Sequence, residues 1–254
     1  MKRSVSALFP CILLLLVLQA AFRSGSSSAA LQETELENRI WQLSVVLRGT
    51  EAEGSGCIYG YDTEKQTLVI VTAGHVLTDL QDGAEVLFAD GTVLPVTSFL
   101  TAEECDLGYA YLACEKLTEE EKQRLEREAA QLFMEDKSGQ VAAVTEGLSD
   151  EKKTDGKFRE AVKVRESSSL QKNDVFHMPD RISTEERSLV TGYVVDPDRY
   201  LEEFGCEMVY ADGSAVSGMS GSGMFDEEGN LIGILCGVTE QYELAGVPAE
   251  NIRK

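Results

Sequence analysis

Short apolar runs separated by turn residues occupy most of the chain. Each run is closed by Gly, Asp or Asn, a pattern typical of antiparallel β-strands. The pattern predicts two groups of strands, which two small barrels or sandwiches would accommodate. The first group lies within residues 41–47, 56–62, 67–73, 84–91, 92–100 and 107–113, and the second within residues 140–147, 160–166, 174–178, 189–195, 206–213, 221–230 and 231–238.

One segment between the two groups has a helical pattern. Leu125, Ala129 and Leu132 recur at helical spacing among charged residues. Thr118 followed by Glu121 forms the pattern of a capping box at the start of a helix. We expect a surface helix within residues 117–136 that joins the two β units and is a solvated connector without chemistry of its own.

The first thirty residues have the order of a secretory signal peptide. A basic start is followed by an apolar run at residues 7–18 and a tract of Ser, Gly and Ala, in which Ser28 and Ala30 suit a cleavage site. The apolar run is short for a bilayer span, and an uncleaved membrane anchor is the alternative. We therefore expect an extracytoplasmic protein, either secreted or anchored on the outer side of the cell membrane. The predicted organisation is a leader or anchor at 1–30, a first barrel at 31–116, the helix at 117–136 and a second barrel at 137–254.

The amino-acid composition indicates a folded domain and disfavours one class of binding partner. The chain has 254 residues, of which 43% are hydrophobic, enough for a substantial core. Its formal net charge of -21 would repel phosphate backbones, so we expect no nucleic-acid partner. We expect a monomer.

The cysteines fit neither a metal site nor a complete set of disulfides. Cys11 lies in the leader, and no pair has CxxC spacing, so a zinc site is not expected. No P-loop or GxGxxG motif follows a strand, and no cofactor is predicted. An odd number of cysteines remains outside the leader, so at least one is free and the pairing stays open. These cysteines are Cys57, Cys105, Cys114, Cys206 and Cys236.

Three local patterns are each ordinary on their own. His75 ends the apolar run "LVIVTAGH", and a histidine at a strand end is commonly structural. Asp106 precedes the run "LGYAYL", as a turn aspartate commonly does. Ser220 lies in "SGMSGSGMF", which alone would suit a flexible turn before a hairpin. Taken together they occur in the order His, Asp, Ser.

The order of these three residues and the local sequence around each of them resemble those of the trypsin-like serine peptidases of the chymotrypsin fold. "TAGHV" resembles the family's TA[AG]H block, "DLGYAYL" its aspartate block and "GMSGSGMF" its GxSG[GS]P block. The resemblance extends from about Ile40 to the C-terminus and is closer to bacterial secreted and periplasmic members than to digestive enzymes. It implies an all-β fold of two six-stranded antiparallel barrels with the predicted helix between them.

The resemblance also implies a mechanism. His75 would be the general base, Asp106 its orienting partner and Ser220 the nucleophile of an endopeptidase that forms an acyl-enzyme on a protein or peptide substrate. The backbone N–H groups of Gly218 and Ser220 would form the oxyanion hole, since glycine at position 218 leaves room for the carbonyl oxygen.

Several positions depart from the family pattern. Met219 replaces the aspartate that pairs with a newly cut N-terminus in animal trypsins, so that activation is not implied. Ser214 would lie at the base of the primary specificity pocket, where its neutrality disfavours strict selection of Lys or Arg. Cys236 would line the substrate strand at a position where many members have serine. Cys105 immediately precedes Asp106, so two thiols could lie near the site, and a redox-sensitive contact there is a further hypothesis.

Three hypotheses about the function remain. The first is a working endopeptidase. The second is a binding module on the same scaffold, a pseudoprotease whose pocket is closed or whose oxyanion loop is collapsed. The third is an acidic β protein in which the three motifs are coincidental. Because no triad residue is lost and three motifs match in order, the first is favoured.

Overall fold

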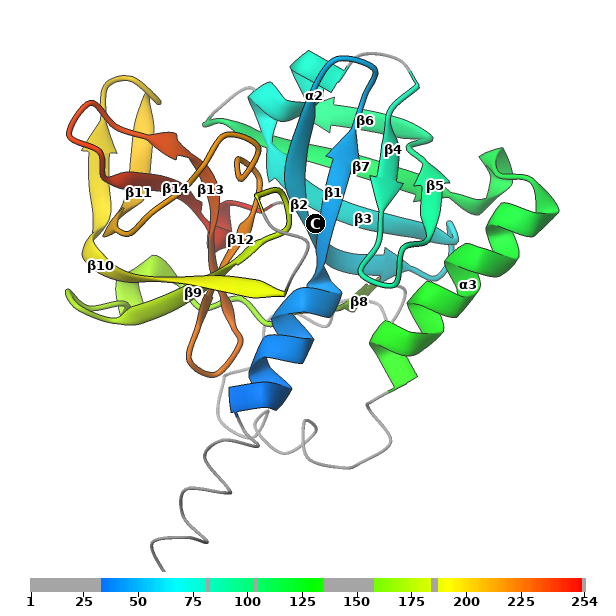
Figure 1. The fold of residues 1–254 in the computed structure, drawn as a ribbon, viewed down its shortest axis with the longest axis horizontal. Helices are drawn as coiled ribbons and strands as arrows, with labels where there is room; N and C mark the ends of the chain where they lie inside the picture. Colours follow the sequence, from blue (N-terminus) through cyan, green and yellow to red (C-terminus); the bar gives the residue numbers. More distant parts are fainter. Residues whose placement is uncertain (1–32, 81–82, 103–104, 135–157, 184–186, 253–254) are drawn as a thin grey trace, which may run out of the picture. The chain divides into compact units, whose positions relative to one another are not determined.

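A computed structural model describes residues 33–80, 83–102, 105–134, 158–183 and 187–252 (Figure 1). The predicted leader at 1–30 and the predicted strand at 140–147 lie outside these residues. None of the helices in the described ranges combines the length and the apolar character needed to cross a membrane. The chain divides into residues 1–38 and 39–254, and both β-sheets lie in the second part.

The first sheet curls around a core built by alternating and continuous apolar strands. Its strands pair antiparallel in the order β5-β4-β1-β2-β3-β7-β6, and β8 pairs with β2. The strands are β1 (Ser44–Arg48), β2 (Glu53–Asp62), β3 (Thr67–Ala73), β4 (Glu85–Leu87), β5 (Val93–Pro95), β6 (Ser98–Thr101), β7 (Leu107–Ala113) and β8 (Phe158–Glu160). The two central strands, β2 and β3, are almost entirely buried, which explains their apolar runs.

The second sheet closes into a six-stranded antiparallel barrel in the order β10-β11-β14-β13-β12-β9. Its strands are β9 (Val175–Asp180), β10 (Ser188–Leu201), β11 (Cys206–Asp212), β12 (Gly223–Asp226), β13 (Leu231–Val238) and β14 (Leu244–Pro248). Phe176, Met178, Val209, Met224 and Ile232 are among the side chains that fill it, each without measurable exposure. Burial of such apolar area is the main stabilising contribution to the barrel.

The predicted fold class is confirmed: the protein is mostly β, with two antiparallel sheets, one of which is a closed six-stranded barrel. Two details differ from the expectation. Among the described residues the first sheet is a curled half-barrel rather than a closed six-stranded one. In addition, β8 joins the first sheet, although the predicted boundaries assign residues 137–254 to the second barrel.

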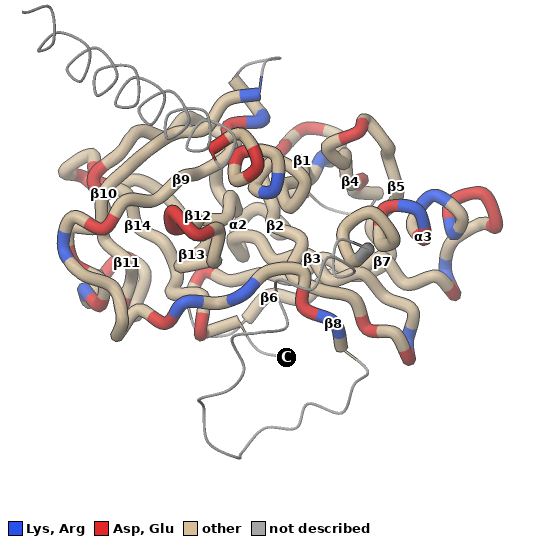
Figure 2. Tube along the Cα trace, turned by 90° about the horizontal axis from the view of Figure 1, so that it is seen from below, with Lys and Arg blue, Asp and Glu red and all other residues tan. Residues whose placement is uncertain are grey.

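The predicted connecting helix is α3 (Glu119–Met134). Its capping box is present: the Glu121 carboxylate accepts from the Thr118 N–H at 2.7 Å, and the Glu121 N–H donates to the Thr118 hydroxyl at 3.4 Å. Leu125 and Leu132 are buried, while acidic and basic residues alternate along the helix (Figure 2).

The remaining helical segments are short. Residues 33–43 are helical, so the strand predicted from Trp41 starts only at Ser44, whose hydroxyl donates to the carbonyls of Ile40 and Trp41 at 2.9 Å each and satisfies the helix end. The others are α2 (Gly74–Leu80), η1 (Cys114–Lys116), η3 (Ser167–Ser169) and η4 (Ala249–Asn251).

Candidate active site

Strand pairing brings His75 and Asp106 together. Strand β3 ends at Ala73 and pairs with β7 in a register that sets Ala73 opposite Leu107. His75 comes two residues after Ala73, at the start of α2, and Asp106 comes one residue before Leu107. Because antiparallel partners keep their ends adjacent, the histidine and the aspartate are neighbours in space despite a sequence separation of 31.

Asp106 holds His75 at two points. The Asp106 Oδ2 atom accepts a hydrogen bond from His75 Nδ1 at 2.5 Å, and its Oδ1 atom accepts from the His75 backbone N–H at 2.8 Å. A Cβ at Gly74 would lie only 3.0 Å from Asp106 Oδ1, so a larger residue would crowd the carboxylate. The ring is therefore fixed in orientation and tautomer, with Nε2 as the nitrogen available for proton transfer.

The two groups shift each other's pKa. The hydrogen bond to Asp106 raises the pKa of His75 above its ordinary value of 6.5, although burial works in the opposite direction. For Asp106, burial raises the pKa, but the hydrogen bonds from His75 outweigh it and the net pKa is lowered. A carboxylate that stays ionised beside an imidazole stabilises the protonated ring, as a general base requires.

Ser220 lies in the loop between β11 and β12. Its hydroxyl donates to the Cys236 carbonyl at 3.3 Å, and the Gly221 N–H donates to the Leu235 carbonyl at 2.7 Å, so β13 supports the loop. Gly218 has a φ of +92° and Gly221 a φ of +89°, a region that favours glycine. The glycines therefore serve a defined backbone conformation rather than a flexible turn.

The backbone around Ser220 leaves two amides available. The Met219 N–H donates to the Val216 carbonyl at 3.1 Å, and the Ser222 N–H donates to the Met219 carbonyl at 3.0 Å. Within the described ranges, the amides of Gly218 and Ser220 have no backbone acceptor. These are the two donors that the sequence predicts for an oxyanion hole. Met219 itself packs in the core of the second barrel with 1% exposure, in place of an ion pair.

Cys236 connects the two halves of the site. Its carbonyl accepts from the Ser220 hydroxyl, and its Sγ–H donates to the Asp106 carbonyl at 3.2 Å. Burial, followed by the nearby Asp106 charge, raises the pKa of the Cys236 thiol, so the side chain is a neutral donor. Hydrogen bonds thus link His75, Asp106, Cys236 and Ser220 in one continuous set drawn from both sheets.

Two predicted features fall outside this set. Ser214 lies exposed in the segment after β11, and no described hydrogen bond ties it to the other four residues. Cys105 is disulfide-bonded to Cys206 rather than lying as a thiol beside Cys236, whereas Cys57, Cys114 and Cys236 are free and buried. Cys105 is therefore not one of two free thiols near the site, as the hypothesis of a redox-sensitive contact assumed.

A residue that the sequence reasoning missed also touches the loop. Ser55 of β2 donates through its hydroxyl to the Gly218 carbonyl at 2.9 Å and through its N–H to the Ser220 carbonyl at 2.8 Å. A serine between Gly54 and Gly56, inside the buried part of β2, was the available signal, because small neighbours permit close approach of backbones.

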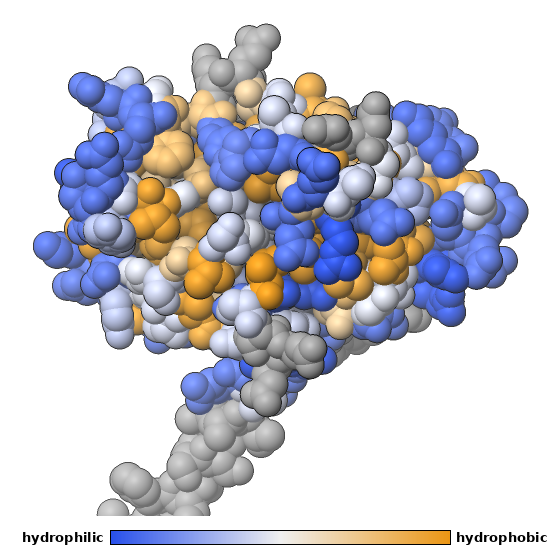
Figure 3. Space-filling view, turned by 45° about the horizontal axis from the view of Figure 1, so that its top comes forward, coloured by the Kyte–Doolittle hydropathy of each residue, from blue (hydrophilic) through white to orange (hydrophobic). Residues whose placement is uncertain are grey.

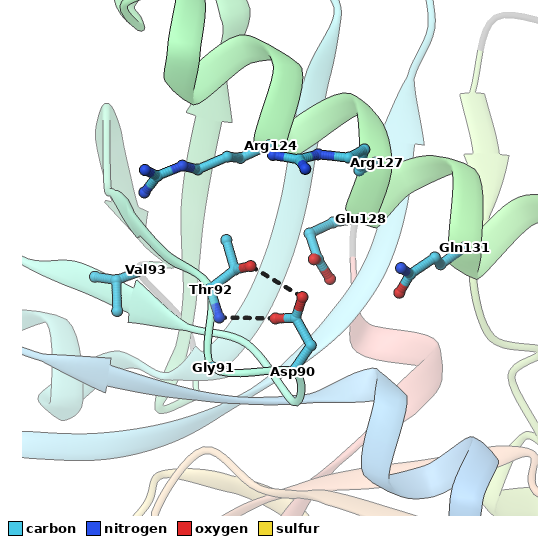
Figure 4. A pocket seen from close by; sticks show the side chains of 8 residues that line it. All are labelled: Asp90, Gly91, Thr92, Val93, Arg124, Arg127, Glu128 and Gln131. Atoms are coloured by element: carbon cyan, nitrogen blue, oxygen red, sulfur yellow. Dashed lines mark hydrogen bonds between the residues drawn. The ribbon is translucent and has the colours of Figure 1, made fainter.

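A cavity beside the first sheet lies apart from the hydrogen-bonded set of His75, Asp106, Cys236 and Ser220. It has a volume of about 320 Å³ and lies between α3 and the β4–β5 hairpin (Figure 4). Asp90, Thr92, Arg124, Arg127 and Glu128 are among its lining residues, and none of the four hydrogen-bonded site residues is. Within the described ranges, no three His, Cys, Asp or Glu side chains gather as metal ligands.

Comparison with known proteins gives matches in family and fold. The sequence model of the trypsin-like peptidase domain family matches residues 54–234. No curated protein matches the chain significantly.

Solved structures resemble it at low sequence identity. The HtrA-type protease AlgW with a tripeptide is 18% identical with a TM-score of 0.57, and the match covers 85% of this chain and 60% of that one. Deg5 is 16% identical with a TM-score of 0.57, with coverage of 87% and 90%. A variant of AlgW is 17% identical with a TM-score of 0.57, and the match covers 85% of this chain and only 59% of that one.

Proposed function

Because the chain belongs to the family of trypsin-like peptidase domains, we propose that it is a serine endopeptidase that cleaves protein or peptide substrates through Ser220, His75 and Asp106. The observation that carries this proposal is the hydrogen-bonded set that joins these residues across the two sheets. This set supports the proposal because it links the segments that carry the three motifs through Cys236.

The first step is attack on the substrate carbonyl. Ser220 Oγ forms a bond to the carbonyl carbon while its proton passes to His75 Nε2. For this the hydroxyl turns from the Cys236 carbonyl, which it contacts at a long 3.3 Å, toward the ring. Asp106 holds the ring and stabilises the imidazolium that forms.

The carbonyl oxygen becomes an oxyanion in this step. The amides of Gly218 and Ser220 donate to it, and losing one such donor typically costs ~10² to 10³ in rate. His75 then gives its proton to the leaving amine, which leaves an acyl-enzyme on Ser220. Water, deprotonated by His75, hydrolyses the ester and restores the serine.

The substrate class is a peptide without a strict requirement for a basic residue. The neutral, exposed Ser214 supports this preference, and the Cys236 strand would hold the substrate backbone. The accessible surface also contains apolar groups between hydrophilic ones (Figure 3). Val216, which precedes Ser220 by four residues, is 48% exposed, and Val238, which follows Cys236 by two, is 45% exposed. Apolar substrate side chains fit such surroundings.

The site of action that we propose is extracytoplasmic. The leader-like first thirty residues support export, with an uncleaved membrane attachment as the other form, and the acidic composition supports a soluble monomer that does not bind nucleic acid. The intact mass of the protein purified from an exporting host reports whether cleavage occurs near Ala30.

The decisive experiment is covalent labelling of the full chain by a fluorophosphonate, which reports a nucleophilic serine without a known substrate. We expect labelling of the wild type, its loss in Ser220→Ala and His75→Ala, and its retention in Ser217→Ala, a neighbouring exposed serine. A folded wild type that takes no label would contradict the proposal and favour the catalytically silent binding module. Partner capture would then be the appropriate experiment.

A further inference from the structure

One residue of the first sheet holds the loop that carries Ser220. Ser55 donates from its backbone N–H to the Ser220 carbonyl at 2.8 Å and from its hydroxyl to the Gly218 carbonyl at 2.9 Å. It is 3% exposed, so water does not compete for either bond. Because these two hydrogen bonds reach a loop more than 160 residues away, they form a contact between the first sheet and the second barrel rather than a local turn.

The bond from the hydroxyl acts on a particular peptide group. The Gly218–Met219 peptide lies between the two peptides whose N–H groups, those of Gly218 and Ser220, would bind the oxyanion. Rotation of this middle peptide changes the angle between the two N–H groups, because each peptide is planar and the chain is continuous. Two bonds oppose that rotation: Ser55 Oγ to the Gly218 carbonyl, and the Met219 N–H to the Val216 carbonyl.

Ser55 is itself held in place. Thr72 of β3, which has no measurable exposure, donates from its hydroxyl to the Ser55 carbonyl at 2.6 Å. On the other side, a Cβ at Gly221 would collide with the Ser55 carbonyl oxygen and the Thr72 hydroxyl. The loop is therefore seated against β2 with no room for displacement in that direction.

We infer that Ser55 is a positioning residue that sets the oxyanion hole through the Gly218 carbonyl. It does not touch the substrate. It acts through the two amides that the proposed function assigns to the oxyanion, so its role rests on that function. Preorganised donors stabilise a transition state because they need no reorganisation as charge develops, and Ser55 supplies that preorganisation.

The test is the rate of fluorophosphonate labelling, since the phosphoryl oxygen of the reagent occupies the oxyanion hole during attack. Ser55→Ala keeps the backbone bond to Ser220 and removes only the bond to Gly218. We expect the labelling rate constant to fall roughly 10- to 100-fold, less than or comparable to the loss of a whole oxyanion donor. The final extent of labelling should stay stoichiometric, because the nucleophile and base are untouched.

A matched control separates this role from ordinary stabilisation. Ser44→Ala removes another buried serine hydroxyl of the same sheet, one that bonds only to the Ile40 and Trp41 carbonyls. We expect it to lower the melting temperature to a similar degree without slowing labelling. Ser55→Cys, in which a thiol replaces the hydroxyl as a weaker donor, serves as the second variant and should label at an intermediate rate.

Each outcome decides the matter. Slow but complete labelling of folded Ser55→Ala, with Ser44→Ala at the wild-type rate, supports the inference. Labelling of folded Ser55→Ala at the wild-type rate overturns it, as does equal slowing in both alanine variants. If Ser55→Ala does not fold, a wild-type rate in Ser55→Cys overturns it instead. A wild type that takes no label defeats the proposed function, and the role of Ser55 falls with it.

Discussion

Cys105, the residue immediately before Asp106, is disulfide-bonded to Cys206, the first residue of β11, with 5.8 Å between their Cα atoms. The bond joins the turn that presents the aspartate in the first sheet to a strand of the second barrel. It therefore closes a covalent loop through both units, next to the hydrogen-bonded set. Cys105 has a φ of +57°, an uncommon conformation for a residue with a side chain.

The disulfide predicts a measurable loss of stability on reduction. The bond spans a sequence separation of 101 residues. For loops of this length the constraint on the unfolded chain gives about 2 to 5 kcal/mol. Urea unfolding of the protein with and without a dithiol reductant measures this difference in the free energy of unfolding.

The double variant Cys105→Ser, Cys206→Ser provides the control for that measurement. Its stability should equal that of the reduced wild type and should not respond to the reductant, because the other described cysteines are free and buried. A reductant effect of the same size in the double variant would refute the assignment of the stability to this bond.

Gly221 predicts an effect on the loop that carries Ser220. Gly221→Ala would adopt a φ near +89° and would also collide with the Ser55 carbonyl and the Thr72 hydroxyl. Gly91 is a matched control, because it has a φ of +90° and a Cβ at this position would meet no atom within 4 Å. We expect Gly91→Ala to cost about 1–2 kcal/mol from the backbone conformation alone.

Gly221→Ala should cost clearly more and should abolish labelling by a fluorophosphonate. Relief of the collision requires movement of the loop that carries Ser220. Thermal unfolding and labelling of the two variants side by side test this. Similar melting temperatures for both would show that the close approach to Ser55 has no energetic weight.

Local patterns were sufficient for much of the fold. Strand-length apolar runs predicted β2, β3, β7 and β13 because each is buried along most of its length. The capping box predicted the start of α3 because its partners, Thr118 and Glu121, are three residues apart. The order of the three motifs led to the residues whose hydrogen bonds join in the structure, although their catalytic roles stay predictions.

Long-range relationships were not available from the sequence. Five cysteines allow several pairings, and only the approach of the turn before β7 to β11 selects Cys105 and Cys206. Position along the chain assigns β8 to the second barrel, but its pairing with β2 makes it part of the first sheet. Likewise, the glycines beside Ser55 are compatible with a close approach of another segment, but nothing in the sequence identifies that segment as the loop near Gly218.

The His75–Asp106 pair predicts the acid side of the pH profile. His75 must be neutral to accept a proton, and the hydrogen bond to Asp106 raises its pKa above 6.5. The acid limb of kcat/KM should therefore lie above pH 6.5 and activity should fall as pH decreases through it. Asp106→Asn should move the limb to lower pH and reduce the maximal rate by ~10⁴-fold, since the charge and the tautomer control are lost.

Asp79→Asn is the control for that profile. Asp79 also raises the pKa of His75 through its charge, as a smaller contribution than the hydrogen bond from Asp106. Its removal should shift the limb slightly and leave the maximal rate near that of the wild type. An acid limb at the same pH in wild type and Asp106→Asn would contradict the assigned pairing.

Glu128 predicts a pH dependence of stability that is independent of the active site. Its side chain faces Asp90 across the cavity beside α3 (Figure 4), and the residue is only 7% exposed. Burial, together with a hydrogen bond to Asp90 and its charge, raises the pKa of Glu128 to about 7, although Thr92 and Arg127 act in the opposite direction. The folded protein thus retains a proton that the unfolded chain releases near its ordinary pKa of 4.5.

The sign of the effect follows from this difference. A pKa raised by folding stabilises the protein below the unfolded value, and the contribution is lost as pH rises through about 7. Glu128→Gln removes the titration, so the variant should gain on the order of 3 kcal/mol relative to wild type between pH 4 and pH 8. Glu126→Gln, an exposed position on the same helix, should show no such gain. The contrary outcome is a difference in the free energy of unfolding between wild type and Glu128→Gln that is the same at both pH values. The Glu128 carboxyl would then be equally protonated in the folded and unfolded chains, and its burial beside Asp90 would carry no electrostatic cost.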